Sequence, residues 1–88
     1  MREQVILITG ANGEIGHGLI RYLAEQNCPI VTLDVNPLDK ALRPLVSKWI
    51  VGDVLDQILL GSLVVEHQIR TIYHLASILS TKAEYNPE

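Results

Sequence analysis

The first residues suited to chemistry are three glycines that follow an apolar run near the start of the chain. They stand at positions 10, 13 and 16, directly after Val5-Ile6-Leu7-Ile8. Gly10 allows a sharp turn, Gly13 lets the backbone approach a ligand with no Cβ in the way, and Gly16 allows a helix to pack closely. A helix beginning here offers free N–H groups and a positive dipole end to phosphates. The spacing therefore predicts a phosphate-binding turn.

An acidic residue, Asp34, stands where a dinucleotide-binding turn is followed by a carboxylate that binds the adenosine ribose. It follows Gly16 by 18 residues and ends a second apolar run, 30–33. A carboxylate at this place accepts hydrogen bonds from both hydroxyls of an adenosine ribose and repels a 2′-phosphate. The next residues, Val35 and Asn36, supply no arginine for that phosphate. We therefore expect the turn to bind a dinucleotide, and NAD rather than NADP.

Other interpretations of the glycine pattern are weaker. The glycines could simply end a strand while Asp34 starts a turn, but strand, turn, helix and acid all stand in register. A P-loop is excluded because the chain has no G-x-x-x-x-G-K-[ST] string. A methyl-donor-binding domain shares the same order of strand, glycine turn, helix and acid, so it stays an alternative.

The whole chain alternates strand patterns with helix patterns. Apolar runs and helically spaced apolar residues predict, in order, strand 5–8, helix 14–26, strand 30–33, strand 49–51, helix 56–67 and strand 71–75. Asp56 is placed to cap the second helix. Pro37 and Pro44 leave room between them for one or two helical turns. This alternation predicts an α/β Rossmann-type three-layer fold, of which the chain supplies the N-terminal half with four parallel strands.

Composition narrows the classes of partner. The 88 residues suffice for one small domain, and 48% of them are hydrophobic. A net charge of −3 without a basic block argues against nucleic acid and anionic membranes as partners. Cys28 is the single cysteine, which excludes an internal disulfide and fits a reducing cytosol. No apolar run has the length of a membrane span, and the N-terminus does not resemble a secretory signal. We therefore expect a cytoplasmic protein.

Four motifs together resemble the extended short-chain dehydrogenase/reductase family, which holds the NAD-dependent sugar epimerases and dehydratases. They are Thr9-Gly10-Ala11-Asn12-Gly13-Glu14-Ile15-Gly16, Asp34, Gly52-Asp53-Val54 and His74-Leu75-Ala76-Ser77. The resemblance covers essentially the whole chain. Within the family, T-I-Y-H-L-A-S-I-L-S and the later Asn86-Pro87 look most like the short-chain type of L-threonine dehydrogenase.

The resemblance implies a role for each matching residue. Residues 12–16 would line the pyrophosphate, Asp34 would hold the adenosine ribose, and Asp53 would accept from the adenine amino group while Val54 packs on the ring. Residues 75–77 would pass beside the nicotinamide-side ribose. The implied cofactor-binding set is Gly10, Asn12, Gly13, Glu14, Ile15, Gly16, Asp34, Asp53, Val54, Leu75, Ala76 and Ser77. Glu14 replaces an aromatic residue common in the sugar epimerases, which favours the dehydrogenases.

The catalytic pair of that family has no counterpart in the 88 residues. The family uses Tyr-x-x-x-Lys, in which the lysine lowers the pKa of the tyrosine. Neither Tyr22 nor Tyr73 has a lysine four residues on, and Tyr85 stands too near the end. We therefore expect residues 1–88 to be the N-terminal part of an NAD(P)-binding Rossmann domain, without the catalytic and substrate-binding regions. Asn86-Pro87 is typical of a helix start, which also suggests the front of a longer protein.

Three functions follow as alternatives. The first is the cofactor-binding part of an NAD-dependent epimerase, dehydratase or dehydrogenase. Its full-length form would act on a nucleotide sugar or an amino acid and form a homodimer through helices beyond residue 88. The second is a non-catalytic module that senses the dinucleotide and binds a protein partner. The third is a structural remnant whose turn cannot order without later strands.

The remaining candidate residues favour structural roles. His17, His67 and His74 have no metal-ligand spacing with one another or with Cys28. His74 ends a strand, which favours a packed or hydrogen-bonded role. His17 stands in a first helical turn, where it could face phosphate, but a solvated role is favoured. Cys28 is expected to be an ordinary buried thiol, and Trp49 is expected to pack in the core.

Overall fold

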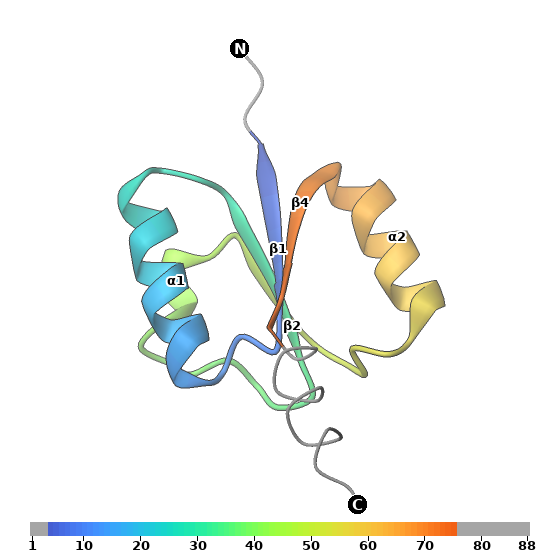
Figure 1. Ribbon diagram of the computed structural model, residues 1–88, viewed down its shortest axis with the longest axis horizontal. Coiled ribbons are helices and arrows are strands. Elements are labelled where there is room, and N and C mark those ends of the chain that lie inside the picture. Colours follow the sequence, from blue (N-terminus) through green and yellow to red (C-terminus); the bar gives the residue numbers. More distant parts are fainter. Residues whose placement is uncertain (1–3, 76–88) are drawn as a thin grey trace, which may run out of the picture.

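A parallel sheet lies between two helical layers in the computed structural model, which describes residues 4–75 (Figure 1). The elements are β1 (Val5–Thr9), α1 (Glu14–Glu25), β2 (Ile30–Asp34), the 3-10 turn η1 (Arg43–Leu45), β3 (Lys48–Val51), α2 (Gln57–His67) and β4 (Ile69–His74). Neighbouring strands pair in parallel in the order β3-β2-β1-β4. The α/β fold with four parallel strands that the sequence predicts is confirmed.

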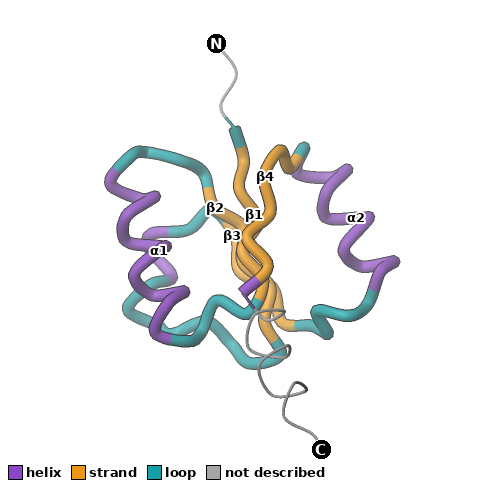
Figure 2. Tube along the Cα trace, viewed as in Figure 1, coloured by secondary structure: helices purple, strands orange, loops and turns teal. Residues whose placement is uncertain are grey.

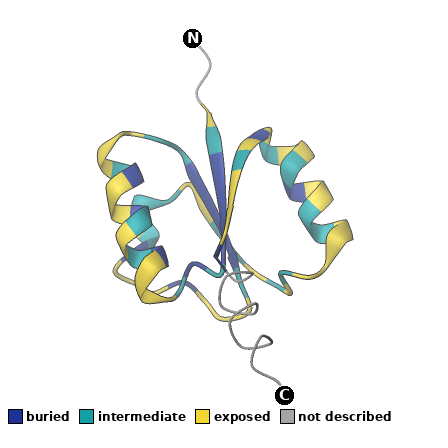
Figure 3. Cartoon of the chain, viewed as in Figure 1, coloured by how far each residue is buried: buried dark blue, intermediate teal, exposed yellow. Residues whose placement is uncertain are grey.

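Strand β1 forms the centre of the molecule because it is apolar on both faces. Its side chains alternate between two cores: Ile6 and Ile8 join the cluster beneath α1, whereas Leu7 joins the cluster beneath α2. Leu7 and Ile8 are fully buried. Figure 3 shows buried residues along the strands and exposed residues on the outer faces of both helices. Burying each such side chain stabilises the fold by roughly 1.5–3 kcal/mol relative to leaving it exposed.

The direction of the strand order reverses at β1. The chain moves from β1 to β2 and β3 with α1 on one face, then returns past β1 to β4 with α2 on the opposite face (Figure 2). In an open parallel sheet, such a reversal leaves a crevice at the carboxyl ends of the strands. The turn after β1 and the loop after β2 both lie at this edge (Figure 1).

The residues at the starts and ends of the helices suit those positions. Asp56 caps α2, because its side chain accepts from the N–H groups of Ile58 and Leu59, each at 3.1 Å; the predicted cap is confirmed. Asn27 and Gln68 follow the helices with φ of 61° and 55°, the left-handed conformation that ends many helices. Among residues 4–75, neither helix is long and apolar enough to cross a membrane.

The position predicted for the short helical turn is wrong. Pro37 and Pro44 do not bracket it; it forms at Arg43–Leu45, with Pro44 inside. Proline is tolerated in a first helical turn, because the N–H group that it lacks has no helical partner there. Residues 37–42 instead follow an irregular path that is held by side-chain contacts.

The bounds of the last described strand also differ from the prediction of 71–75. Strand β4 begins at Ile69, which pairs with Val5 across a register shift. The strand ends at His74, and the next residue, Leu75, is buried in the cluster beneath α1. The polar Arg70 separates Ile69 from the predicted strand, so the sequence pattern placed the start of the strand too late.

Helix α1 lies close to the turn that precedes it. This close contact predicts that a larger residue at position 16 lowers the stability of the fold. A Cβ at this position would lie 2.0 Å from the carbonyl oxygen of Ala11. Gly16→Ala should therefore destabilise the fold by about 1–3 kcal/mol, although alanine is the better helix former. Urea denaturation measures this change in the free energy of unfolding.

The matched control is Gly18→Ala in the same helix. A Cβ at Gly18 would meet no atom within 4 Å, so this substitution should stabilise the fold by about 0.5–1 kcal/mol. Equal effects of the two substitutions would contradict the packing described for α1.

Candidate dinucleotide-binding site

The turn between β1 and α1 is built on Gly10. This residue has a φ of 71°, a conformation that favours glycine, and its N–H donates to the carbonyl of Leu33 at 2.8 Å. The turn thus leaves β1 in contact with the end of β2. Gly13 occupies the N-cap position of α1 and has no side chain that could cap the helix. The first N–H groups of α1 therefore have no helical partner, which is the arrangement that anions bind.

Gly13 is not required by the fold itself. Its φ of −84° suits any residue, and a Cβ there would meet no protein atom within 4 Å. The glycine leaves open space directly beside the unpartnered N–H groups of α1. This space fits a phosphate that approaches the backbone closely, which is the role predicted for Gly13 from the sequence.

Glu14 and Ile15 lie beside this space in the first turn of α1. Both side chains are exposed, and 60% of Ile15 is accessible to solvent. Their backbones can therefore face a ligand, whereas Gly16 is buried against the turn. The pyrophosphate contacts predicted for these residues remain predictions.

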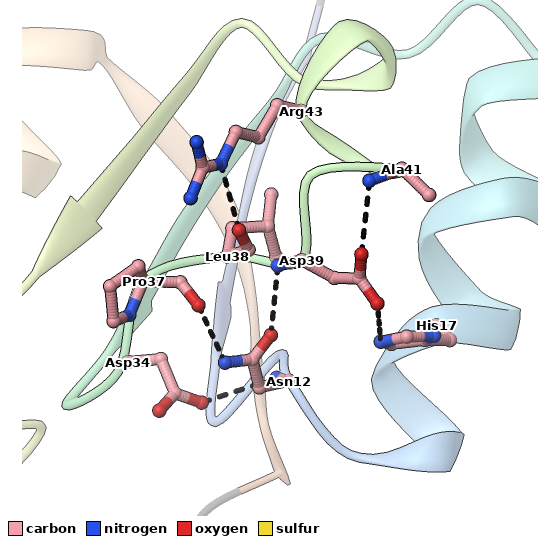
Figure 4. A network of polar contacts seen from close by, with 8 residues as sticks. All are labelled: Asn12, His17, Asp34, Pro37, Leu38, Asp39, Ala41 and Arg43. Atoms are coloured by element: carbon pink, nitrogen blue, oxygen red, sulfur yellow. Dashed lines mark hydrogen bonds and ion pairs between the residues drawn. The ribbon is translucent and has the colours of Figure 1, made fainter.

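The Asp34 carboxylate is oriented by two backbone N–H groups. Its Oδ2 accepts from Asn12 at 3.1 Å and its Oδ1 accepts from Asn36 at 3.0 Å. Figure 4 shows the carboxylate beside Asn12 at the turn. A carboxylate has about four acceptor sites, so about two remain, one on each oxygen. The acid is thus joined to the glycine turn and keeps acceptors for two hydroxyl groups.

Asp53 and Val54 follow β3 at the same edge of the sheet. The N–H of the preceding residue, Gly52, donates to the backbone carbonyl of Asp34 at 2.9 Å, which brings the two acids into one region. Oδ1 of Asp53 accepts from the N–H of Leu55 at 2.9 Å. Val54 is half-buried against the core beneath α2. The adenine contacts implied for Asp53 and Val54 stay predictions.

The end of β4 is held against the end of β1. Thr9 is fully buried, and its Oγ1 lies 2.5 Å from Nδ1 of His74. The hydrogen-bonded role predicted for His74 is therefore confirmed. The next residue, Leu75, is buried in the same core cluster as Ala11 of the glycine turn. Ala76 and Ser77, the other residues predicted here, lie outside the described residues.

A family model decides the relationship of this chain to known proteins. The model, described as the NAD dependent epimerase/dehydratase family, matches residues 6–88. The chain belongs to the NAD-dependent epimerase/dehydratase family. The resemblance to the extended short-chain dehydrogenases/reductases is thereby confirmed.

A curated relative in this family is a dTDP-D-glucose 4,6-dehydratase from Dictyostelium discoideum. It is 36% identical over 83 residues, and the match covers 84% of this chain and 19% of the relative. The chain thus spans about a fifth of the length of this relative.

Three solved structures share the fold of this chain. A GalE-like L-threonine dehydrogenase from Cupriavidus necator, in its holo form, has a TM-score of 0.73 at 34% identity, covering 93% of this chain and 27% of that one. A UDP-glucose 4-epimerase from Brucella ovis in complex with NAD has a TM-score of 0.69 at 24% identity, covering 81% and 22%. A dTDP-glucose 4,6-dehydratase from Bacillus anthracis in complex with NAD has a TM-score of 0.68 at 22% identity, covering 81% and 26%.

The histidines of this epimerase/dehydratase-family chain make local contacts. His17 is partly exposed to solvent, and its Nε2 lies 3.8 Å from Oδ2 of Asp39. Nε2 of His67 is buried at the end of α2 without a partner among the described residues. Across residues 4–75, no three His, Cys, Asp or Glu side chains lie close enough together to hold a metal ion.

Sequence reasoning missed the contacts that shape the loop after Asp34. The guanidinium of Arg43 stacks 4.1 Å from the centroid of the Trp49 ring, and its Nε donates to the carbonyl of Leu38 at 2.8 Å. The side chain of Asn12 also reaches this loop. Trp49 is half-buried against the core, as predicted. No local pattern signals the other contacts, since their partners are distant in sequence or lie in irregular backbone.

The open space at Gly13 predicts that a larger residue there affects ligand binding far more than folding. Gly13→Val should abolish NAD binding because its side chain would fill the space beside the first N–H groups of α1. The loss of a favourable N-cap residue should cost about 1 kcal/mol of stability at most. Isothermal titration calorimetry measures the binding, and circular dichroism measures the fold.

The control for Gly13→Val is Gly61→Ala on α2. Gly61 also has open space around it, but it lies on a helix away from the turn, so binding should be unchanged. Retained NAD binding by Gly13→Val would contradict the phosphate site.

Proposed function

We propose that this chain is the NAD-binding portion of an NAD-dependent epimerase, dehydratase or dehydrogenase, and that it does not catalyse a reaction by itself. In this proposal, residues 1–88 are the N-terminal part of an NAD(P)-binding Rossmann domain. One observation carries the proposal. The start of α1 offers unpartnered N–H groups to a phosphate, and the Asp34 carboxylate, which could hold the ribose, is hydrogen-bonded to the same glycine turn. Membership of an NAD-dependent family supports the same cofactor.

Asp34 supports NAD in preference to NADP. One acceptor site on each carboxylate oxygen matches the two hydroxyls of an adenosine ribose. A 2′-phosphate would instead bring a second negative charge against this carboxylate. The following residues, Val35 and Asn36, are exposed and carry no positive charge that could offset the repulsion.

The chemistry would belong to the whole enzyme. When bound, the nicotinamide supplies hydride transfer, and this chain binds and orients the adenosine and pyrophosphate end. The 88 residues hold no Tyr-x-x-x-Lys pair that could move a proton. The substrate class that we propose is a nucleotide sugar or an amino acid, because the relatives named above include both kinds of enzyme. A homodimer and a cytosolic location belong to this same proposal.

A second candidate is a non-catalytic module that senses the dinucleotide and binds a protein partner. The missing catalytic pair favours it. Assays of hydride transfer on the full-length protein, with L-threonine and with UDP- and dTDP-sugars as substrates, separate the two candidates. Reduction of NAD or interconversion of a sugar would support the enzyme, whereas tight NAD binding with no turnover on either substrate class would favour the module.

The position of Asp34 predicts that replacing it changes both the affinity for NAD and the choice between NAD and NADP. Asp34→Ala should weaken NAD binding at least tenfold, because hydrogen bonds to a charged acceptor contribute about 1.5–3 kcal/mol. It should also narrow the preference for NAD over NADP, since the repulsion is removed. Calorimetric titration of both cofactors into the original protein and the variant measures these changes.

Glu25→Ala is the control, because it removes the same charge at the far end of α1, where Glu25 is exposed. It should leave both affinities unchanged. If Asp34→Ala binds both cofactors as tightly as the original protein, the ribose site has been misplaced.

A further inference from the structure

The side chain of Asn12 connects the glycine turn to the loop that follows Asp34. Its Nδ2 donates to the carbonyl of Pro37 at 2.8 Å, and its Oδ1 accepts from the N–H of Asp39 at 3.1 Å. Its backbone N–H donates to Oδ2 of Asp34 at 3.1 Å. In Figure 4 the amide points from the turn toward the loop, between Pro37 and Asp39. One residue of the turn thus makes three hydrogen bonds to residues 34–39.

These hydrogen bonds matter because the loop has little else to fix its path. Residues 35–42 form neither helix nor strand, and most of their side chains are exposed. The buried Leu38 and Leu42 anchor the loop in the core. Its other side-chain hydrogen bonds are local, from Asn36 to Asp34, from Ala41 to Asp39 and from Arg43 to Leu38. From α1, Nε2 of His17 also lies 3.8 Å from Oδ2 of Asp39. The Asn12 side chain makes the hydrogen bonds that tie this loop to the phosphate turn.

We propose that Asn12 is a positioning residue for the adenosine ribose, and that its side chain does not act as a phosphate ligand. This inference rests on the proposed function. It differs from the role that the sequence resemblance implied, in which Asn12 lines the pyrophosphate. The carbonyl and one N–H of the amide are already used by the loop, which turns the amide toward the ribose side of the site.

Asn12 acts on cofactor choice through Asp34. Asn36, which donates to Oδ1 of Asp34, belongs to the loop that the Asn12 side chain holds. When the loop is fixed, both carboxylate oxygens are oriented and one acceptor site on each remains for the ribose. When the Asn12 side chain no longer holds the loop, Asn36 no longer orients the Asp34 carboxylate. The preference of the site for NAD, with two free ribose hydroxyls, over NADP, with a 2′-phosphate, then weakens.

A double-mutant cycle between Asn12→Ala and Asp34→Ala tests this dependence. Asn12→Ala alone should weaken NAD binding about tenfold, because the cofactor must then order a loop that the free protein no longer holds, and should narrow the preference for NAD over NADP. In the Asp34→Ala background the same substitution should change the affinity by less than about twofold, because the group that it positions is gone. Gln26→Ala, which truncates an exposed amide at the end of α1, is the matched control and should have no effect.

The results of this cycle show whether the role of Asn12 fails by itself or together with the proposed function. If the two substitutions weaken NAD binding independently, Asn12 contacts the cofactor itself and the inference is overturned while the NAD site stands. Unchanged affinity in Asn12→Ala also overturns it. If the original protein does not bind NAD, or if Asp34→Ala has no effect, the proposed function itself fails.

Amide hydrogen exchange supplies a test on the original protein, so it does not depend on whether a variant folds. The N–H of Asp39 should be protected in the original protein before any cofactor is added, because its bond to Asn12 belongs to the free structure. An Asp39 N–H that exchanges at the rate of an open chain without NAD would overturn the inference.

Discussion

The pairing of β1 with β2 on one side and β4 on the other is the constraint on which the rest of this structure depends. Because the strand order reverses at β1, the connections on its two sides cover opposite faces. Because all four strands are parallel, their carboxyl ends lie at one edge of the sheet. The glycine turn, Asp34, the Gly52-Asp53 segment and the end of β4 are far apart in the sequence. They come together because each of them follows a strand in this sheet.

Two glycines of the turn show how packing and binding place different demands on the same motif. Gly16 is fixed by the fold, since any Cβ there would collide with the backbone of Ala11. Gly13 has free space around it and an ordinary backbone conformation, so packing does not require a glycine there, and the proposed phosphate site would. The Asn12 side chain and the Asp34 carboxylate then join the glycine turn to the loop that follows β2. The turn, the acid and the loop are therefore connected by hydrogen bonds into one unit.

Most of the fold could be predicted from the sequence because local patterns determine it. Continuous apolar runs indicated buried parallel strands, and Asp56 indicated the start of α2, because both signals act within a few residues. The short turn at Arg43–Leu45, the early start of β4 and the hydrogen bonds of Asn12 could not be predicted in this way. The first depends on how Arg43 stacks on Trp49 and bonds to Leu38. The second depends on register with β1, and the third joins residues 25 and 27 positions apart.

The central claim is that NAD binds across the glycine turn and Asp34. The most direct test follows the backbone N–H resonances of the protein by nuclear magnetic resonance while NAD is added. The account predicts that the largest changes fall on Gly13–Gly16 and on Asn36, whose N–H groups lie at the phosphate and ribose ends of the site. Changes that fall mainly on α2, on the opposite face of the sheet, would contradict it.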